Sequence, residues 1–215
     1  MLSDENTYDI LSRHVEKFFG QVDGVLHEVS REPPHVDVLI IKATEEKPFH
    51  VLITSGMSDL PMNTPNADVP AYIELMLVLP SNWQMPKSFE IVGENQQEWH
   101  WPIDLLRYLA HFPHSYGTWL GFGHTIPNGD SFASFSNNTL LCGTIILPPC
   151  YMPKEFQKLS INKEKHIQFF SVVPLYQEEM DLKQEQGTGV LLDLFNQNGI
   201  NELLIVDRVN VARLL

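Results

Sequence analysis

The sequence predicts an α+β fold built around a mainly antiparallel sheet. The first observation is the order of its apolar patterns. Strand-like runs and helix-like periods are both present, but they do not alternate in the regular strand–helix–strand order of a doubly wound fold. The second is composition, since 43% of the 215 residues are hydrophobic and twelve Phe and four Trp can fill a large core. The sequence shows no internal repeat or long linker, so we expect one domain over residues 1–215.

The N-terminal part is expected to form a helix followed by two strands. Residues 4–19 carry apolar side chains on one helical face, and Gly20 provides the stop signal. Residues 35–42 alternate early and then become continuously apolar, while residues 49–55 are rich in β-branched side chains. The short segment between these two runs favours a hairpin.

A third strand is predicted over residues 72–80, where a proline ends the apolar run YIELMLVLP. Glu74 is the unusual member of this run. It either faces solvent at a sheet edge or pairs with a buried partner, and we favour solvent because unpaired carboxylates are rarely buried. A helix is predicted over residues 99–114, with Pro102 as its first residue and Pro113 at its end.

The C-terminal half adds shorter elements. Their predicted ranges are a strand at 139–149, a short helix at 153–159, a strand at 166–176 that Pro174 turns, helices at 175–186 and 190–199, and a short closing helix at 207–215. Glu179 lies four residues before Lys183, which supports the first of the two longer helices.

The net charge of −13 restricts the classes of partner. Binding to nucleic acid needs clustered Lys and Arg that displace counterions, so it is not expected, and an anionic membrane surface would repel the chain. A basic protein partner would be attracted by the same field. The acidic start MLSDENTYD lacks the features of a secretory signal, and no apolar run is long enough to span a membrane. We therefore expect a cytoplasmic protein in which Cys142 and Cys150 are reduced.

Candidate catalytic and metal-binding residues are few. His111, His114 and His124 could supply ligands to one metal ion, but a proline between the first two interrupts a common helical face, and no Cys pair or HExxH motif accompanies them. Loop histidines bonded to backbone are the simpler interpretation, so no metal or other cofactor is expected. An enzyme that uses His114 or His124 with Asp59, or a hydrolase that also uses Ser58, is the alternative function.

Residues 113–128, PHSYGTWLGFGHTIPN, combine glycine turns with aromatic side chains. Glycine permits positive φ and close backbone approach, and Trp119 lies between two such turns. The glycine spacing GxxxGxG is not that of a phosphate-binding loop. The pattern suits a loop wrapped on its own core, a docking site for an extended peptide, or a catalytic loop, and the sequence leaves these open.

Six long segments occur in a characteristic order. They are HVDVLII (35–41), ITSGMSDLPM (53–62), YIELMLVLP (72–80), FPHSYGTWLGFGHTIPN (112–128), GTIILPP (143–149) and FFSVVPLYQEEMDLK (169–183). Together they resemble the Suppressor of fused-like domain in its compact bacterial form. The resemblance covers about residues 30–212, after an N-terminal helix at about 4–20. It implies a central, strongly twisted sheet with flanking helices and no known catalytic activity.

The resemblance also implies that the chain binds proteins. Animal Suppressor of fused sequesters zinc-finger transcription factors of Hedgehog signalling by clamping a short peptide as an added strand between its two halves, and bacterial members are expected to include immunity proteins. Only one half is expected here, so that clamp cannot be transferred whole. With the negative charge, this favours a non-catalytic immunity-type or regulatory inhibitor that occludes a basic toxin or binds a peptide as an added strand.

The expected partner-binding residues are flat aromatic side chains beside glycine turns, together with nearby polar and acidic positions. They are Ser58, Asp59, Trp101, Tyr116, Trp119, His124, Glu178, Glu179 and Asp181. Aromatic side chains supply contact area and carboxylates supply charge complementary to a basic partner.

Overall fold

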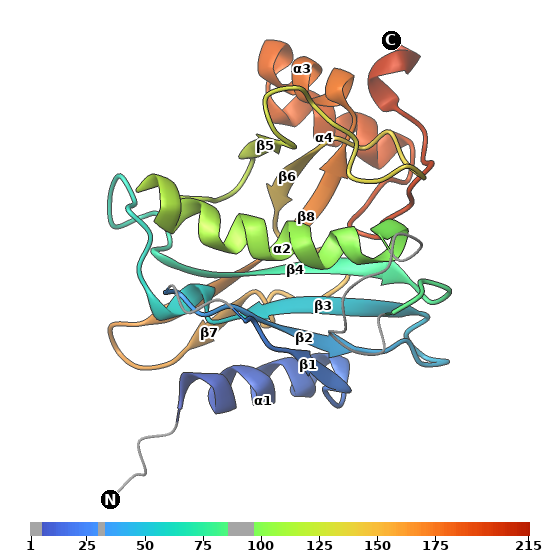
Figure 1. Ribbon diagram of the computed structural model, residues 1–215. Coiled ribbons are helices and arrows are strands. Elements are labelled where there is room, and N and C mark those ends of the chain that lie inside the picture. Colours follow the sequence, from blue (N-terminus) through green and yellow to red (C-terminus); the bar gives the residue numbers. More distant parts are fainter. Residues whose placement is uncertain (1–5, 30–32, 86–96) are drawn as a thin grey trace, which may run out of the picture.

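One mixed sheet forms the centre of the fold. The computed structural model describes residues 6–29, 33–85 and 97–215, and within them eight strands form one sheet in the order β1-β2-β3-β4-β8-β6-β5, with β7 paired to β8 (Figure 1). The strands are β1 (Gly24–Leu26), β2 (Asp37–Ile41), β3 (Phe49–Ser55), β4 (Tyr72–Pro80), β5 (Thr125–Pro127), β6 (Gly143–Leu147), β7 (Lys158–Ser160) and β8 (His166–Leu175). Among these strands, only β4 and β8 pair in parallel. The predicted α+β fold with a mainly antiparallel sheet is confirmed.

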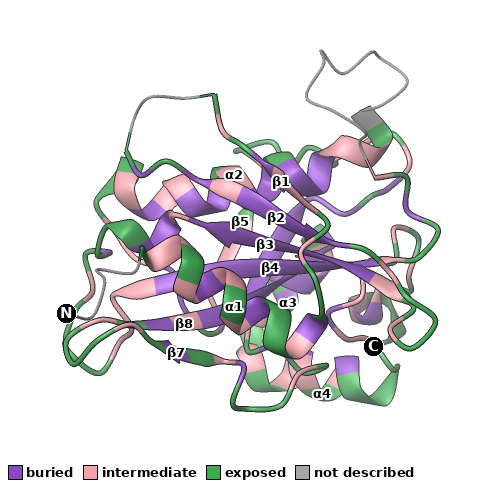
Figure 2. Ribbon diagram, turned by 90° about the horizontal axis from the view of Figure 1, so that it is seen from below, coloured by how far each residue is buried: buried purple, intermediate pink, exposed green. Residues whose placement is uncertain are grey.

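Two long helices cover opposite faces of this sheet. α1 (Thr7–Phe19) packs in a core cluster that contains Leu39, whereas α2 (Gln97–Tyr116) packs in one that contains Val38. Successive side chains on a strand point to opposite faces, so the two helices sandwich β2 between them (Figures 1 and 2). Burial on both faces explains why residues 38–41 read as a continuous apolar run rather than an alternating one.

A third core cluster lies beneath the C-terminal helices. α3 (Gln177–Gln186), α4 (Thr188–Gln197) and the 3₁₀ helix η3 (Val211–Leu214) pack on β6 and on the end of β8. Figure 1 shows this group at the top of the molecule, far from α1. The helices predicted in this part of the chain are confirmed, the last of them as a 3₁₀ turn.

The boundaries predicted for α2 are wrong at both ends. Pro102 and Pro113 lie inside the helix, which continues to Tyr116. Each proline removes one main-chain hydrogen bond. The helix continues because its inner face, which includes Leu106 and Leu109, is fully buried against the sheet, and burying each such side chain contributes roughly 2 kcal/mol.

Two further predictions in the C-terminal half are also wrong. Pro174 does not turn the chain but stays in β8, opposite Thr144 of β6. The pairing of β8 with β4 ends at Ser171, so a residue without an N–H costs no bond to β4 at this position. Of the residues 153–159 predicted as a helix, 154–157 form a turn and a bend, and the last two already belong to β7.

Glu74 is buried rather than exposed at a sheet edge, which corrects the favoured interpretation. Its carboxylate accepts hydrogen bonds from the Thr54 hydroxyl at 2.6 Å and from the backbone N–H groups of Gly56 and Ser58 at 3.1 and 3.0 Å. The last two belong to the turn that contains the 3₁₀ helix η1 (Met57–Asp59). The buried acid therefore fixes this turn against the middle of the sheet.

This carboxyl group should make stability depend on pH. Burial raises the pKa of Glu74 from 4.5 to about 7, despite the three donors that act in the other direction. Since the folded pKa lies above the unfolded one, the stabilisation is fully present below about pH 4.5 and is lost as pH rises to about 7. The free energy of unfolding of the wild type should fall by about 3 kcal/mol more than that of Glu74→Gln over this window. Urea unfolding of both proteins at either end of the window measures the difference, and equal pH dependence would contradict it.

Candidate protein-binding site

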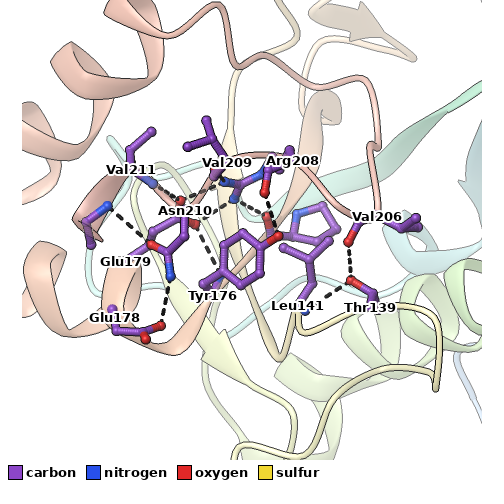
Figure 3. A network of polar contacts seen from close by, with 12 residues as sticks. Thr139, Leu141, Tyr176, Glu178, Glu179, Val206, Arg208, Val209, Asn210 and Val211 are labelled. Carbon is purple, nitrogen blue, oxygen red and sulfur yellow. Dashed lines mark hydrogen bonds and ion pairs between the residues drawn. The ribbon is translucent and has the colours of Figure 1, made fainter. Parts of the chain in front are cut away.

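A hollow of about 480 Å³ opens where the first turn of α3 meets the segment that precedes η3. We call it the α3 groove. It is lined by Phe132, Ser134, Leu140, Cys142, Tyr176, Gln177, Glu178, Arg208, Val209, Asn210, Arg213 and Leu214. Figure 3 shows how side chains from α3, from the end of β8 and from the C-terminal segment converge there. The lining thus comes from residues 132–142, 176–178 and 208–214, which are distant in sequence and together build one concave surface.

A buried ion pair forms the base of the α3 groove. Both Nη atoms of Arg208 donate to the two oxygens of Glu179 at 2.6 Å, and neither side chain has appreciable exposure. The same carboxylate accepts from the backbone N–H groups of Tyr176 and Val211, both at 3.1 Å. Arg208 also donates to the Pro174 carbonyl at 2.9 Å. Each oxygen of the Glu179 carboxylate thus accepts two hydrogen bonds, so the ion pair is a rigid structural unit.

A second, exposed ion pair lies at the rim of the α3 groove. Arg213 donates to Glu178 through Nη2 at 2.6 Å and through Nε at 2.9 Å, and Asn210 donates to the other oxygen at 2.9 Å. A hydrogen bond from its own backbone N–H, followed by the Arg213 guanidinium, lowers the pKa of Glu178. Both side chains are open to solvent, so this pair contributes little to stability.

The rim also exposes large apolar side chains. Leu140 is 67% exposed, Leu214 56% and Val209 44%. The loop that carries Leu140 is held to the C-terminal segment, because Thr139 donates to the Val206 carbonyl at 2.6 Å. Exposed apolar groups around a rigid, polar base are typical of a surface that binds another protein.

Comparison with known proteins assigns the family. The family model for Suppressor of fused protein matches residues 32–209. The chain belongs to the Suppressor of fused family. No curated protein matches the sequence.

Solved structures show the same fold as this Suppressor of fused family member. A suppressor of fused homologue from Neisseria gonorrhoeae is 18% identical, with a TM-score of 0.69 over 95% of this chain and 96% of its own. A chain of the Sufu–Fu complex is 15% identical, with a TM-score of 0.66 over 97% of this chain and 93% of its own. Drosophila Suppressor of Fused is 14% identical, with a TM-score of 0.56. The match covers 97% of this chain but only 51% of the Drosophila chain.

The acidic residues predicted to bind a partner have different positions and roles in this Suppressor of fused fold. Glu178 lies in the α3 groove, and Asp181 is exposed on the same helix. Glu179 is fully buried, so its function is structural. The arginines that hold both glutamates, Arg208 and Arg213, were missed. The only signal for them is the basic residues of DRVNVARLL in an acidic chain.

The glycine-rich loop is wrapped on its own core. A Cβ on Gly121 would lie 2.8 Å from the Trp119 ring, and one on Gly123, at φ +78°, would lie 3.1 Å from Thr188 of α4. The rings of Trp119 and His124 are 4.1 Å apart. Close packing therefore accounts for Gly121 and Gly123, and Trp119 and His124 are both half-buried within this loop.

The remaining predicted residues do not join the α3 groove. Trp101 is buried in the core and stacks on Phe135 at 4.9 Å, so it presents no surface to a partner, contrary to expectation. Ser58 is fully buried as well. Asp59 is exposed but lines a different hollow of about 270 Å³ beside the start of α1. Tyr116 is exposed near the end of α2.

The histidines and cysteines have local roles. Desolvation lowers the pKa of both His114 and His124. Asp59, the acidic residue expected to act with them, instead lies 3.9 Å from Lys165. His111 contacts Glu28 at 2.8 Å. Across residues 6–29, 33–85 and 97–215, no group of three or more His, Cys, Asp or Glu side chains could hold a metal ion.

Neither thiol is activated as a nucleophile. Burial raises the pKa of Cys142, and burial with the nearby Glu202 carboxylate raises that of Cys150 to about 11. Both cysteines are free. In the part of the chain that the structure describes, no helix has the length and apolar character needed to cross a membrane.

Proposed function

We propose that this protein is a non-catalytic inhibitor of the immunity or regulatory type, which binds a basic partner protein in the cytoplasm and covers its working surface. The observation that carries the proposal is the α3 groove. It combines a rigid base, made by Glu179 and Arg208, with exposed Leu140, Val209 and Leu214 on the rim. A preorganised surface loses little conformational entropy when a partner binds, so its apolar rim can contribute to affinity.

Charge favours a basic partner over other classes. The chain carries 27 acidic and 14 basic residues. Two of the arginines near the α3 groove are already paired with Glu178 and Glu179, while Asp181 is exposed on the same helix. A basic toxin is one such partner, and its association would be faster at low salt because of long-range attraction. Membership of the Suppressor of fused family and the Sufu–Fu complex formed by another protein of this fold support a role in protein binding.

Affinity capture from lysate of the source organism tests this function with matched baits. Leu140→Ser and Leu214→Ser each remove an exposed apolar group from the rim, and Val29→Ser removes one that is 89% exposed elsewhere. Wild type and Val29→Ser should retain the same basic protein at near-equal stoichiometry, and the two rim variants should retain at least about tenfold less.

The purified partner then allows a direct test of inhibition. Addition of wild type should suppress the partner's activity in proportion to the complex formed, whereas the rim variants should not. Retention that is unchanged in both rim variants would place the binding surface elsewhere. A partner whose activity is unaffected in the complex would remove the inhibitor role.

A further inference from the structure

Three aromatic side chains form a continuous stripe along the outer face of α2. Tyr108, Phe112 and Tyr116 follow one another at four-residue spacing, so they share one side of the helix. The ring centroids of Tyr108 and Phe112 are 6.0 Å apart, and those of Phe112 and Tyr116 are 4.8 Å apart. Tyr108 is 46% exposed and Tyr116 67%, whereas Phe112 between them is half-buried and packs against the core cluster beneath α2. The two tyrosines are therefore the open part of this stripe, on a helix that lies along the outside of the sheet in Figure 1.

Carboxylates flank the aromatic stripe. Asp104 lies one turn before Tyr108 on the same face, and its side chain is 65% exposed. Asp130 is exposed in the loop after β5. Burial, the neighbouring Tyr116 and then the charge of Asp130 raise the pKa of Tyr108. The stripe therefore has an exposed carboxylate on its own helix face and a second negative charge nearby in the loop after β5.

The cations of α2 are directed away from this face. Arg107 donates to the carbonyls of Leu26 and His27 at 2.9 and 3.1 Å. His111 contacts Glu28 at 2.8 Å on the same side of the helix as Arg107. His100 contacts Asp104 at 3.0 Å, so this carboxylate has one basic neighbour on its own helix. The aromatic stripe therefore has negative charge beside it and no Lys or Arg side chain of its own helix over its rings.

We infer that the outer face of α2 binds an extended segment of a partner protein that carries arginine or lysine at alternate positions. A guanidinium or ammonium group over the face of an aromatic ring is attracted by the ring quadrupole, and nearby carboxylates strengthen the attraction. In an extended strand, side chains on one side recur at about 6.6 Å. The ring centroids are 6.0 and 4.8 Å apart, which is shorter than this repeat, and the long, flexible side chains of Arg and Lys can span the difference to reach successive rings.

This surface is independent of the α3 groove. Its residues come from α2 and the loop after β5, and none of them lines that groove. The inference stands if the inhibitor role fails, because it concerns the chemistry of a bound segment and not the activity of the partner. The phosphates of a nucleic acid would be repelled by Asp104 and Asp130, which favours a basic protein segment.

Two peptides of identical composition test the inference. Acetyl-GRGRGRG-amide places arginine at alternate positions, and acetyl-GRRRGGG-amide places the same arginines side by side. Each is titrated into the full chain at low salt, and the affinity is measured by isothermal titration calorimetry, which does not depend on the tyrosines that the variants remove. The variants are the double substitution Tyr108→Ser with Tyr116→Ser, and Tyr151→Ser as a control at another exposed tyrosine. A second comparison uses two double variants. One combines Asp104→Asn with Asp130→Asn, and its control combines Asp68→Asn with Asp193→Asn, which changes the net charge equally.

The alternating peptide should bind wild type more tightly than the block peptide. The tyrosine double variant should weaken its binding by about 5- to 30-fold, the loss expected for two exposed cation–π contacts, while Tyr151→Ser should leave it unchanged. Removing Asp104 and Asp130 should weaken binding more than removing Asp68 and Asp193. The inference would be overturned if neither peptide bound detectably, or if the two peptides bound equally well. It would also be overturned if a double variant and its control lost the same affinity.

Discussion

Arg208→Ala should lower the free energy of unfolding by about 3–5 kcal/mol. The substitution leaves the Glu179 carboxylate fully buried without its two charged donors, and it removes the bond to the Pro174 carbonyl. It also removes a guanidinium that lies 5.1 Å from the Tyr176 ring and 5.2 Å from the Phe195 ring. Urea unfolding at neutral pH, analysed with a common m-value, measures the loss.

Arg213→Ala is the matched control, because this arginine also pairs with a glutamate of α3, at 2.6 Å. That pair is exposed to solvent, so its loss should cost less than about 1 kcal/mol. The double variant Arg208→Ala with Glu179→Ala should recover part of the stability lost by Arg208→Ala, since no buried charge is then unpaired. Similar losses for Arg208→Ala and Arg213→Ala would show that burial does not distinguish the two pairs.

Gly56→Ala should destabilise the protein by about 3 kcal/mol or more. Gly56 has φ +118°, a region that side chains rarely adopt, and an added Cβ would lie 2.0 Å from the backbone oxygen of His35. That oxygen belongs to the main chain just before β2, so it cannot move aside as a flexible side chain could. The substitution must displace either this segment or the turn at η1, whose Gly56 N–H also binds Glu74.

Gly117→Ala separates the effect of backbone conformation from that of the steric clash. Gly117 also has positive φ, at +61°, but nothing lies within 4 Å of an added Cβ. Its substitution should cost only about 1–2 kcal/mol, the ordinary penalty for a left-handed residue. Chemical denaturation of both variants measures the difference, and a loss for Gly56→Ala no larger than that for Gly117→Ala would mean that the chain near His35 relaxes at little cost.

The strands of the central sheet could be predicted well from the sequence. Residues 49–55 and 72–80 match β3 and β4 at both ends, because each run is rich in β-branched or apolar residues and is flanked by glycine or proline. The hairpin of β2 and β3 could be predicted equally well, because only a short polar segment separates the two strands. Local chemistry is sufficient where a strand is buried on both faces and its neighbour is close in sequence.

The remaining features depend on contacts between distant residues. Pro102 and Pro113 were predicted to start and end a helix, but packing of α2 on the sheet outweighs the one hydrogen bond that each removes. Pro174 was predicted to turn the chain, but it lies beyond the pairing of β8 with β4 and stays in the strand. Glu74 was expected in solvent because its donors lie about twenty residues away, in another strand and turn. The pairing of Glu179 with Arg208 spans 29 residues, and neither position carries a pattern that identifies the other.

Trp101 shows the same limit for the candidate site. An aromatic residue near glycine turns suits either a core or a surface, and only the stacking on Phe135 decides between them. The apolar rim of the α3 groove could not be predicted from the sequence, for the opposite reason. Leu140 stands in an apolar run that reads as a buried strand, yet its side chain points outward before β6 begins.

The position of Arg107 has a consequence for how copies of this protein behave when they are crowded together. The two ends of the sheet are β1 and β5, each of three residues. At β1 the Leu26 carbonyl is already occupied by the Arg107 guanidinium. At β5, Pro127 has no N–H to offer and its carbonyl accepts from Gly129 at 3.1 Å. The further edge at β7, which pairs with β8, is also only three residues long. A second copy would therefore find only short edges with which to extend the sheet, and the fold resists the edge-to-edge stacking that begins aggregation.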